Sequence, residues 1–441
     1  MKKLKIIGLS TALATSLFAL QQPEYDYISI SMGGVGVASS YGSMSSYLNP
    51  ALIVNRDNKR TEFAIDLGIA IQEHELGDDL SKIDDSDVSY TLDEISKGRG
   101  DRKDIRDNAN QITEALKSLA KKESNYLMLS PRAALSFKIG RHFSLGVFAN
   151  VNAKIKAVID ESRLKYITKN DSDDLKYLGE YIKYDPNSKA NAYKSSSETE
   201  YKQKSIEYAM KENNSTRLDL NGVSIVEIPL TIANSTQIGG FNIDWGVSAK
   251  YIQATTTSTK ILFTDDDYDP TKELDKNKIT TNTFGVDLGI VAYSEDSGFK
   301  FAISGKNLNT PEFDVENGAK YKLEPKITTG IAYSATDMID LEIDYDLSTL
   351  TDELTNQKYR YIGAGINFHP LTWFSIRGGV RENQEDDYNG LIYSAGLSFG
   401  LKWLQLDVAV QVSENSGNYD GSEIPRYVNG NIAIVSKWGD N

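Results

Sequence analysis

Near its C-terminus the chain reads Leu404-Gln405-Leu406-Asp407-Val408-Ala409-Val410-Gln411-Val412, with a large apolar side chain at every second position. Side chains alternate between the two faces of a β-strand, so this spacing predicts a strand with one apolar face. Segments 63–71 and 339–345 repeat the pattern. A strand of a soluble sandwich alternates in the same way. Alternation therefore predicts strands without deciding between a sandwich and a membrane barrel.

The lengths of the connections between strands favour the barrel. The connections that follow even-numbered strands are short, whereas those that follow odd-numbered strands are longer, up to 158–220. Short periplasmic turns that alternate with long external loops are typical of outer-membrane barrels. We predict an all-β fold, a 14-stranded antiparallel transmembrane β-barrel over residues 59–441. Its candidate strands are 59–72, 124–138, 141–157, 221–235, 239–254, 283–294, 298–307, 324–335, 338–347, 358–368, 372–382, 391–401, 403–413 and 426–437.

Composition narrows the classes of function. The 441 residues include no cysteine and only three histidines, so we expect no disulfide, no metal site and no cofactor. A net charge of −14 argues against nucleic acid, which is bound through lysine and arginine. Aromatic residues near the strand ends, such as Trp373 and Trp403, fit an interfacial girdle, although ordinary core aromatics would give the same pattern.

The N-terminus predicts export. Lys2, Lys3 and Lys5 precede a short apolar run, which is typical of a signal peptide over residues 1–19. The run is too short for a spanning helix. We therefore expect the mature protein in the bacterial outer membrane, with membrane lipid as its first partner.

Residues 20–58 do not alternate and are rich in glycine and serine. The glycine cluster resembles a phosphate-binding loop only weakly, because no strand precedes it. Met32-Gly33-Gly34-Val35-Gly36-Val37-Ala38, followed by Asn49-Pro50-Ala51-Leu52-Ile53, resembles the start of FadL-type outer-membrane transporters. The segments Gly305-Lys306-Asn307-Leu308 and Glu324-Pro325 also look like those of the family. The branch named plasmid conjugal transfer protein TraF is the most similar.

The resemblance implies a hatch, a segment folded inside the barrel that plugs it. Its functional residues would be Gly33, Gly34, Gly36, Asn49, Pro50 and Ala51. In FadL-type transporters a kinked strand beside the hatch opens the barrel wall sideways. Pro131 and Pro229 interrupt candidate strands here, because proline cannot donate to the ladder. A proline at a membrane-interface strand end is the simpler interpretation of Pro131.

The long loops 73–123, 158–220 and 255–282 should be extracellular. Helical spacing of apolar residues predicts a short amphipathic helix over 101–121, and 198–211 is a second candidate. The acidic run 265–269 lacks the turn glycine and terminal glutamate of a calcium loop, so a solvated loop is favoured.

Large apolar side chains should face lipid, which leaves the other face to line the lumen. Charges of both signs then line it, and two interpretations stay open. The charges pair with one another and with the plug, or they form a path in which a cation holds the carboxylate of an amphipathic substrate. The residues of the predicted substrate path are Phe148, Lys326, Asp340, Glu342, Asp344, Arg377 and Arg381.

Two functional hypotheses follow. The first is a hatch-gated channel for hydrophobic or amphipathic small molecules, fatty acids among them. The second is a non-transporting component of a conjugation or secretion apparatus that acts through its extracellular loops. No Gly-x-Ser-x-Gly elbow is present and no histidine lies beside an acid and a serine on an inward face, so we expect no enzyme. A lumen cavity of a few hundred Å³ or a side opening would favour transport, whereas a lumen filled by the hatch and salt bridges, with no opening, would rule it out.

Overall fold

The computed structural model describes most of the chain, and the signal-peptide segment and the acidic run 265–269 lie outside the described residues. The described residues are 24–54, 61–97, 99, 102–122, 125–164, 198–264, 277–315, 320–352, 357–401, 403–419 and 422–439.

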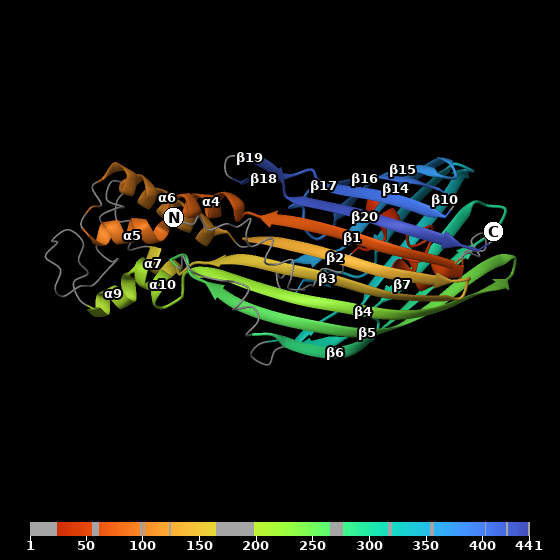
Figure 1. Cartoon of the computed structure of the whole chain (residues 1–441), viewed down its shortest axis with the longest axis horizontal. Helices are drawn as coiled ribbons and strands as arrows, with labels where there is room; N and C mark the ends of the chain where they lie inside the picture. The colour runs from red at the N-terminus through yellow and green to blue at the C-terminus, as the bar shows by residue number, and fades with distance from the viewer. Residues whose placement is uncertain are drawn as a thin grey trace.

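Fourteen antiparallel strands close into one barrel, which confirms the predicted fold (Figure 1). Each strand pairs with its neighbours along the barrel, and the last strand closes the ring by pairing with the first. In ring order the strands are β1 (Thr61–His74), β2 (Tyr126–Ile139), β3 (Phe143–Val158), β4 (Arg217–Ile238), β5 (Phe241–Ile261), β6 (Ile279–Tyr293), β7 (Phe299–Lys306), β10 (Lys326–Thr336), β11 (Ile339–Asp346), β14 (Tyr361–Leu371), β15 (Phe374–Asn383), β16 (Ile392–Leu401), β17 (Leu404–Ser413) and β20 (Tyr427–Trp438).

The two faces of the wall differ as the alternation predicts. In β16 the apolar Leu397, Phe399 and Leu401 are more than half exposed, while Ser394 and Ser398 are buried in the lumen. A soluble protein would bury the apolar face, so this inversion is the signature of a barrel whose outside meets lipid.

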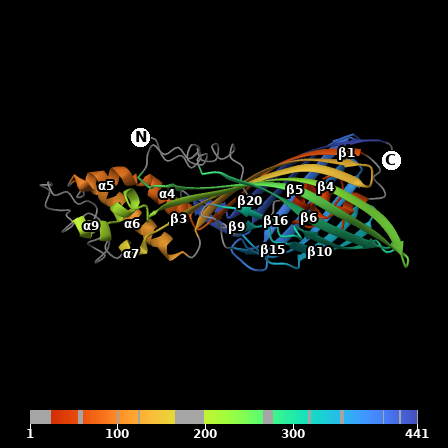
Figure 2. The same ribbon diagram turned by 90° about the horizontal axis from the view of Figure 1, so that it is seen from below.

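The barrel wall is taller on one side. β4 and β5 span 22 and 21 residues, because they continue past the membrane and carry a group of helices. The loop after β5 is therefore shorter than we expected, since β5 ends at Ile261 and β6 begins at Ile279. The helices gather beyond that end of the barrel in both views, and the short turns lie at the opposite end (Figures 1 and 2).

We call this helical group the cap. Its helices are α4 (Gly77–Asp85), α5 (Val88–Ser96), α6 (Lys103–Lys121), α7 (Glu161–Leu164), α9 (Glu198–Lys204) and α10 (Ile206–Lys211). They share a buried apolar core with the outward faces of the extended strands, to which Ile112 and Leu116 of α6 and Leu220 of β4 belong. The helices predicted over 101–121 and 198–211 are thus present. None of the helices in the described part of the chain has the length and apolar character needed to cross a membrane.

Three small hairpins complete the external loops. They pair β8 (Glu312–Asp314) with β9 (Lys320–Lys322), β12 (Leu350–Thr351) with β13 (Lys358–Tyr359), and β18 (Ser416–Tyr419) with β19 (Ser422–Pro425).

Residues 24–54 lie inside the barrel, and we call them the inner segment. They form α2 (Tyr27–Ser31), α3 (Ser45–Leu48) and a 3-10 turn (Pro50–Val54), and nearly all of their side chains are buried. Asp26 caps α2 by accepting hydrogen bonds from the backbone N–H groups of Ile28 and Ser29. The segment appears in Figure 1 as the red ribbon enclosed by the strands.

Candidate functional site: the filled lumen

Glycines of the barrel wall let the backbone of the inner segment approach closely. A Cβ atom added at Gly379 would lie 2.2 Å from the carbonyl carbon of Met32, and one at Gly365 would lie 2.3 Å from its carbonyl oxygen. Gly33 itself has a φ of +77° and leaves no space for a side chain against Val380. These contacts form a socket on β14 and β15 that only glycine permits.

A second socket holds the Asn49-Pro50-Ala51 motif. A Cβ at Gly246 would lie 2.5 Å from the Pro50 carbonyl, and one at Gly289 would lie 1.8 Å from the side-chain oxygen of Asn49. The Asn49 side chain donates to the Val37 carbonyl at 2.9 Å and accepts from the Ala51 N–H at 3.0 Å. Asn49 therefore links the middle of the inner segment, at Val37, to its C-terminal turn beside β5 and β6.

Two acids of β11 hold the turn between the sockets. Asp344 accepts hydrogen bonds from the N–H groups of Gly36 at 2.8 Å and Val37 at 3.0 Å. Glu342 accepts from the N–H of Ala38 at 2.7 Å and from the hydroxyl of Ser39. Both carboxylates are buried. These four hydrogen bonds fix the turn to the wall.

The remaining predicted lumen residues form further ion pairs. Arg377 pairs with Asp407 at 3.1 Å, and both are almost fully buried. Arg381 pairs with Glu24 of the inner segment and lies against the rings of Tyr361 and Tyr427. The other two pairs are Lys326 with Asp346 at 3.2 Å and Asp340 with His369 at 3.0 Å. Asp340 lies at the short-turn end of β11, away from the inner segment.

Phe148 belongs to an aromatic cluster with two tyrosines of the inner segment. Its ring stacks on Tyr47 with centroids 4.6 Å apart, and Tyr25 meets both rings edge-on. A Cβ at Gly146 would lie 2.3 Å from the Phe148 ring, so the ring covers this glycine from inside.

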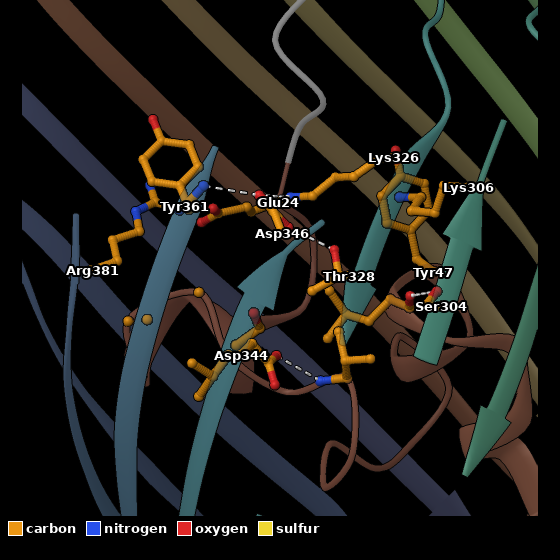
Figure 3. A pocket seen from close by; sticks show the side chains of 17 residues that line it. Glu24, Tyr47, Ser304, Lys306, Lys326, Thr328, Asp344, Asp346, Tyr361 and Arg381 are labelled. Atoms are coloured by element: carbon orange, nitrogen blue, oxygen red, sulfur yellow. Dashed lines mark hydrogen bonds and ion pairs between the residues drawn. The ribbon is translucent and has the colours of Figure 1, made fainter. Parts of the chain in front are cut away.

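A polar cavity of about 70 Å³ lies between the inner segment and β7, β10, β11, β14 and β15 (Figure 3). Lys306, Lys326 and Arg381 line it together with Glu24, Asp344 and Asp346. The cavity is far smaller than the few hundred Å³ of a typical ligand pocket. Around this cavity the inner segment and its polar contacts fill the lumen in this conformation.

The hydrogen-bonded wall is interrupted on both sides of β3. The pairing of β2 with β3 omits Ser130 and Pro131, and the pairing of β3 with β4 omits Gly146, Val147, Ile228 and Pro229. The register is the same before and after each interruption. The other irregularities that the described barrel ladders contain lie beside short turns, at 334–336 and 368–371.

The two prolines explain the interruptions. Backbone groups of a strand point alternately to its two neighbours. The N–H of Ala233 bonds to the His142 carbonyl beside β3, so odd positions of β4, including Pro229, face β3. The N–H of Glu73 points to β20, so the register of β1 with β2 makes odd positions of β2, including Pro131, face β3. Each proline therefore lacks the N–H that would bond to β3. Pro131 lies in mid-strand rather than at a strand end.

The sequence predicted the correct face for the lumen residues, because the alternation of apolar and polar residues assigns each side chain to the lipid or the lumen face. It did not pair Glu342 and Asp344 with main-chain N–H groups, since a carboxylate gives no sign in sequence of which donor it will meet. It also passed over the wall glycines. Their recurrence at inward positions of neighbouring strands was the signal that could have found them. Within the ranges that the structure describes, no three His, Asp or Glu residues are arranged to hold a metal ion.

The sequence of this chain matches the model of a known protein family. The model of the family described as "F plasmid transfer operon, TraF, protein" matches residues 46–346. The chain belongs to this TraF family. No curated protein sequence matches it.

Several solved structures are similar to this chain. The CymD monoaromatic hydrocarbon channel is 9% identical with a TM-score of 0.51, over 96% of this chain and 100% of that one. The toluene transporter TbuX of Ralstonia pickettii is 12% identical with a TM-score of 0.48, over 94% and 98%. A FadL homologue of Pseudomonas aeruginosa is 10% identical with a TM-score of 0.45, over 96% and 99%. The likeness to CymD shows a shared fold, and the closed barrel with its apolar outer face places the TraF chain in the outer membrane.

Proposed function

We propose that this protein is an outer-membrane channel for hydrophobic or amphipathic small molecules, with the inner segment as its hatch. The observation that carries the proposal is the pair of interruptions flanking β3, with the Tyr25, Tyr47 and Phe148 rings directly behind the one at Gly146. An apolar lining behind a weakened wall is suited to passing a hydrophobic molecule sideways into the membrane. The printed name of the similar structure CymD, a monoaromatic hydrocarbon channel, agrees with it.

The filled lumen corresponds to the closed state of this channel. Contacts between the inner segment and the wall comprise hydrogen bonds, close backbone packing at two glycine sockets and buried apolar packing, without any covalent link. The hydrogen bonds can be exchanged for bonds to water when the segment withdraws. The predicted hatch residues Gly33, Gly34, Gly36, Asn49, Pro50 and Ala51 lie at or beside these contacts, which supports their proposed role.

Restoring the missing donors should close the side exit. The double substitution P131A/P229A supplies two backbone N–H groups directed at β3, each worth about 1 kcal/mol once bonded. We expect cells that express the wild type to take up the fluorescent hydrophobic probe N-phenyl-1-naphthylamine faster than cells without the protein. The double variant should lower this gain about tenfold.

The matched control is P370A, because Pro370 lies in β14 near a short turn, away from β3. It should leave uptake unchanged. Equal uptake by the wild type and by cells without the protein would count against the channel. An unchanged rate in P131A/P229A would count against the side exit alone.

The cap favours a second candidate function, in which the protein serves a conjugation or secretion apparatus through its extracellular face. The loops are not merely long, because they fold around a core that includes Ile105, Ile112 and Leu116, all at 0% exposure. A channel alone does not need a folded cap. The description of the matched family as a product of a plasmid transfer operon agrees with this second candidate.

Destabilising the cap separates the two candidates. L116A removes a fully buried side chain and should cost the cap roughly 2–5 kcal/mol. We expect α6 to become sensitive to brief proteolysis while uptake of the probe stays at the wild-type rate. The substitution E114A alters an exposed neighbour of Leu116 and should change neither the proteolysis of α6 nor the uptake of the probe. Loss of uptake in L116A would show that the cap serves the channel itself.

A further inference from the structure

Tyr47 of the inner segment occupies a slot with three chemically distinct sides. Its ring stacks on Phe148 at 4.6 Å with an interplanar angle of 28°. The ammonium of Lys306 lies over the ring, 3.2 Å from its centroid. The buried carboxylate of Glu227 lies beside the Tyr47 hydroxyl. Phe148, Lys306 and Glu227 belong to β3, β7 and β4, so the wall supplies these sides and the inner segment supplies the ring.

Lys306 differs from the two lysines nearest to it in the lumen. Its neighbour Lys250 forms ion pairs with both nearby carboxylates, Glu227 at 3.0 Å and Asp287 at 3.0 Å. Lys326, which is the cross-strand partner of Lys306, pairs with Asp346. Within the described residues Lys306 forms no ion pair and contacts the face of Tyr47 instead. Burying an ammonium group costs free energy because it loses its hydration. The ring in this slot offsets part of that desolvation cost.

We propose that Tyr47 is a built-in substitute for a ligand, and that the slot accepts a phenol-type molecule when the hatch withdraws. This inference rests on the proposed channel function and narrows its substrate class. The side chain of Tyr47 has the chemistry of para-cresol, so a free phenol reproduces each contact that the wall makes with it. The slot borders the Gly146 interruption through Phe148 and the polar cavity through Tyr47 and Lys306.

The three sides discriminate between ligand classes. Lys306 requires a π face, which an alkyl chain or a saturated ring lacks. Glu227 already accepts from Lys250 and can accept a further hydrogen bond from a phenol hydroxyl, which toluene or an ether of a phenol cannot donate. Phe148 requires a flat apolar face. A phenol satisfies all three.

The ligand competes with Tyr47 for one position. Its apparent affinity is therefore its intrinsic affinity reduced to the fraction of molecules in which the slot is vacant. Removing the Tyr47 side chain removes the competitor, while the wall residues that recognise the ring remain. The inference thus predicts that a Tyr47 truncation binds phenol more tightly than the wild type does.

Calorimetric titration of the full chain in detergent micelles tests this. We expect Y47A to bind para-cresol at least about tenfold more tightly than the wild type does. In Y47A, para-cresol should bind about tenfold more tightly than 4-methylanisole, which lacks the donor, and than 4-methylcyclohexanol, which lacks the π face. Adding K306M to Y47A should weaken para-cresol binding about tenfold.

Matched variants test whether any cavity left by a truncated side chain would bind para-cresol as well as the slot does. Y27A removes another buried tyrosine of the inner segment, over which the described structure places no cation, and it should not select para-cresol over the two analogues. K300M alters another inward lysine of β7, which lies over Tyr293, and should leave binding in the Y47A background unchanged. If Y47A does not fold, Y47F keeps the ring but releases Glu227, and should bind para-cresol between the wild-type and Y47A affinities.

Three results would overturn the inference: no gain in Y47A or Y47F, an equal gain in Y27A, or equal binding of the three ligands. Probe uptake tells this failure apart from failure of the channel. Uptake without phenol selection would remove only the phenol assignment. Phenol selection without uptake would remove the channel and leave a binding slot.

Discussion

The substitution Gly379→Ala is expected to leave the barrel folded and to displace the inner segment from it. The new Cβ would lie 2.2 Å from the carbonyl carbon of Met32 and 2.4 Å from the nitrogen of Gly33. These are backbone atoms, which cannot rotate away as a side chain does. Overpacking of this kind costs roughly 1–3 kcal/mol, which shifts the equilibrium between docked and withdrawn states by about 5- to 150-fold. Planar-bilayer recordings should therefore show G379A channels conducting ions far more often than the wild type.

Gly378 is the matched control, because it is the adjacent residue on β15 and faces outward. A Cβ there would have no neighbour closer than 3.8 Å, so G378A should conduct as the wild type does. Equal conductance of G379A and the wild type, with both folded as β-barrels, would mean that this socket does not hold the lumen closed.

The double substitution E342Q/D344N should produce the second large effect. It replaces two carboxyl acceptors by amides, whose N–H₂ groups cannot accept from Gly36, Val37 and Ala38. A hydrogen bond contributes about 1 kcal/mol net, and four bonds to the turn are weakened, so the expected loss is roughly 3 kcal/mol. We expect the withdrawn state to gain about 100-fold in population.

A single cysteine can report that population, because the natural chain has none. Ser29 is fully buried in the inner segment and lines the polar cavity, so S29C is a small change at a protected position. Its maleimide labelling rate should rise about 100-fold in E342Q/D344N. D346N alters the next inward acid of β11, which contacts Lys326 and Thr328 rather than the inner segment, and should leave the rate unchanged. The same slow labelling in all three proteins would refute a role for these carboxylates in holding the segment.

The sequence predicted the barrel well because two periodicities carry it. Alternation along segments such as 404–412 assigns each side chain to a face, and the alternation of connection lengths orders the strands. Strand number and ring order are confirmed as predicted. The lengths of β4 and β5 were underestimated, because their ends pack against cap helices instead of lipid and so lose the membrane pattern.

The contents of the lumen were less accessible from sequence. The Asn49-Pro50-Ala51 motif and the glycine cluster indicated a hatch only through the resemblance. The partners of Asp344 and Lys306 depend on where an irregular segment settles, and no periodicity describes such a segment. Pro131 was informative for a local reason, since a proline removes one hydrogen bond wherever the strand runs.

The turn at 36–38 is held by its main chain, and this has a consequence for how the protein can change over generations. Asp344 and Glu342 recognise amide N–H groups, which every residue except proline carries at these positions. The recognition therefore imposes no side-chain identity on Val37 or Ala38 beyond what their packing requires. The two acids, in contrast, have no such substitute. Substitutions should therefore accumulate at Val37 and Ala38 of the inner segment. Substitutions of Glu342 and Asp344 should be removed by selection, because these two acids hold the segment to the barrel wall.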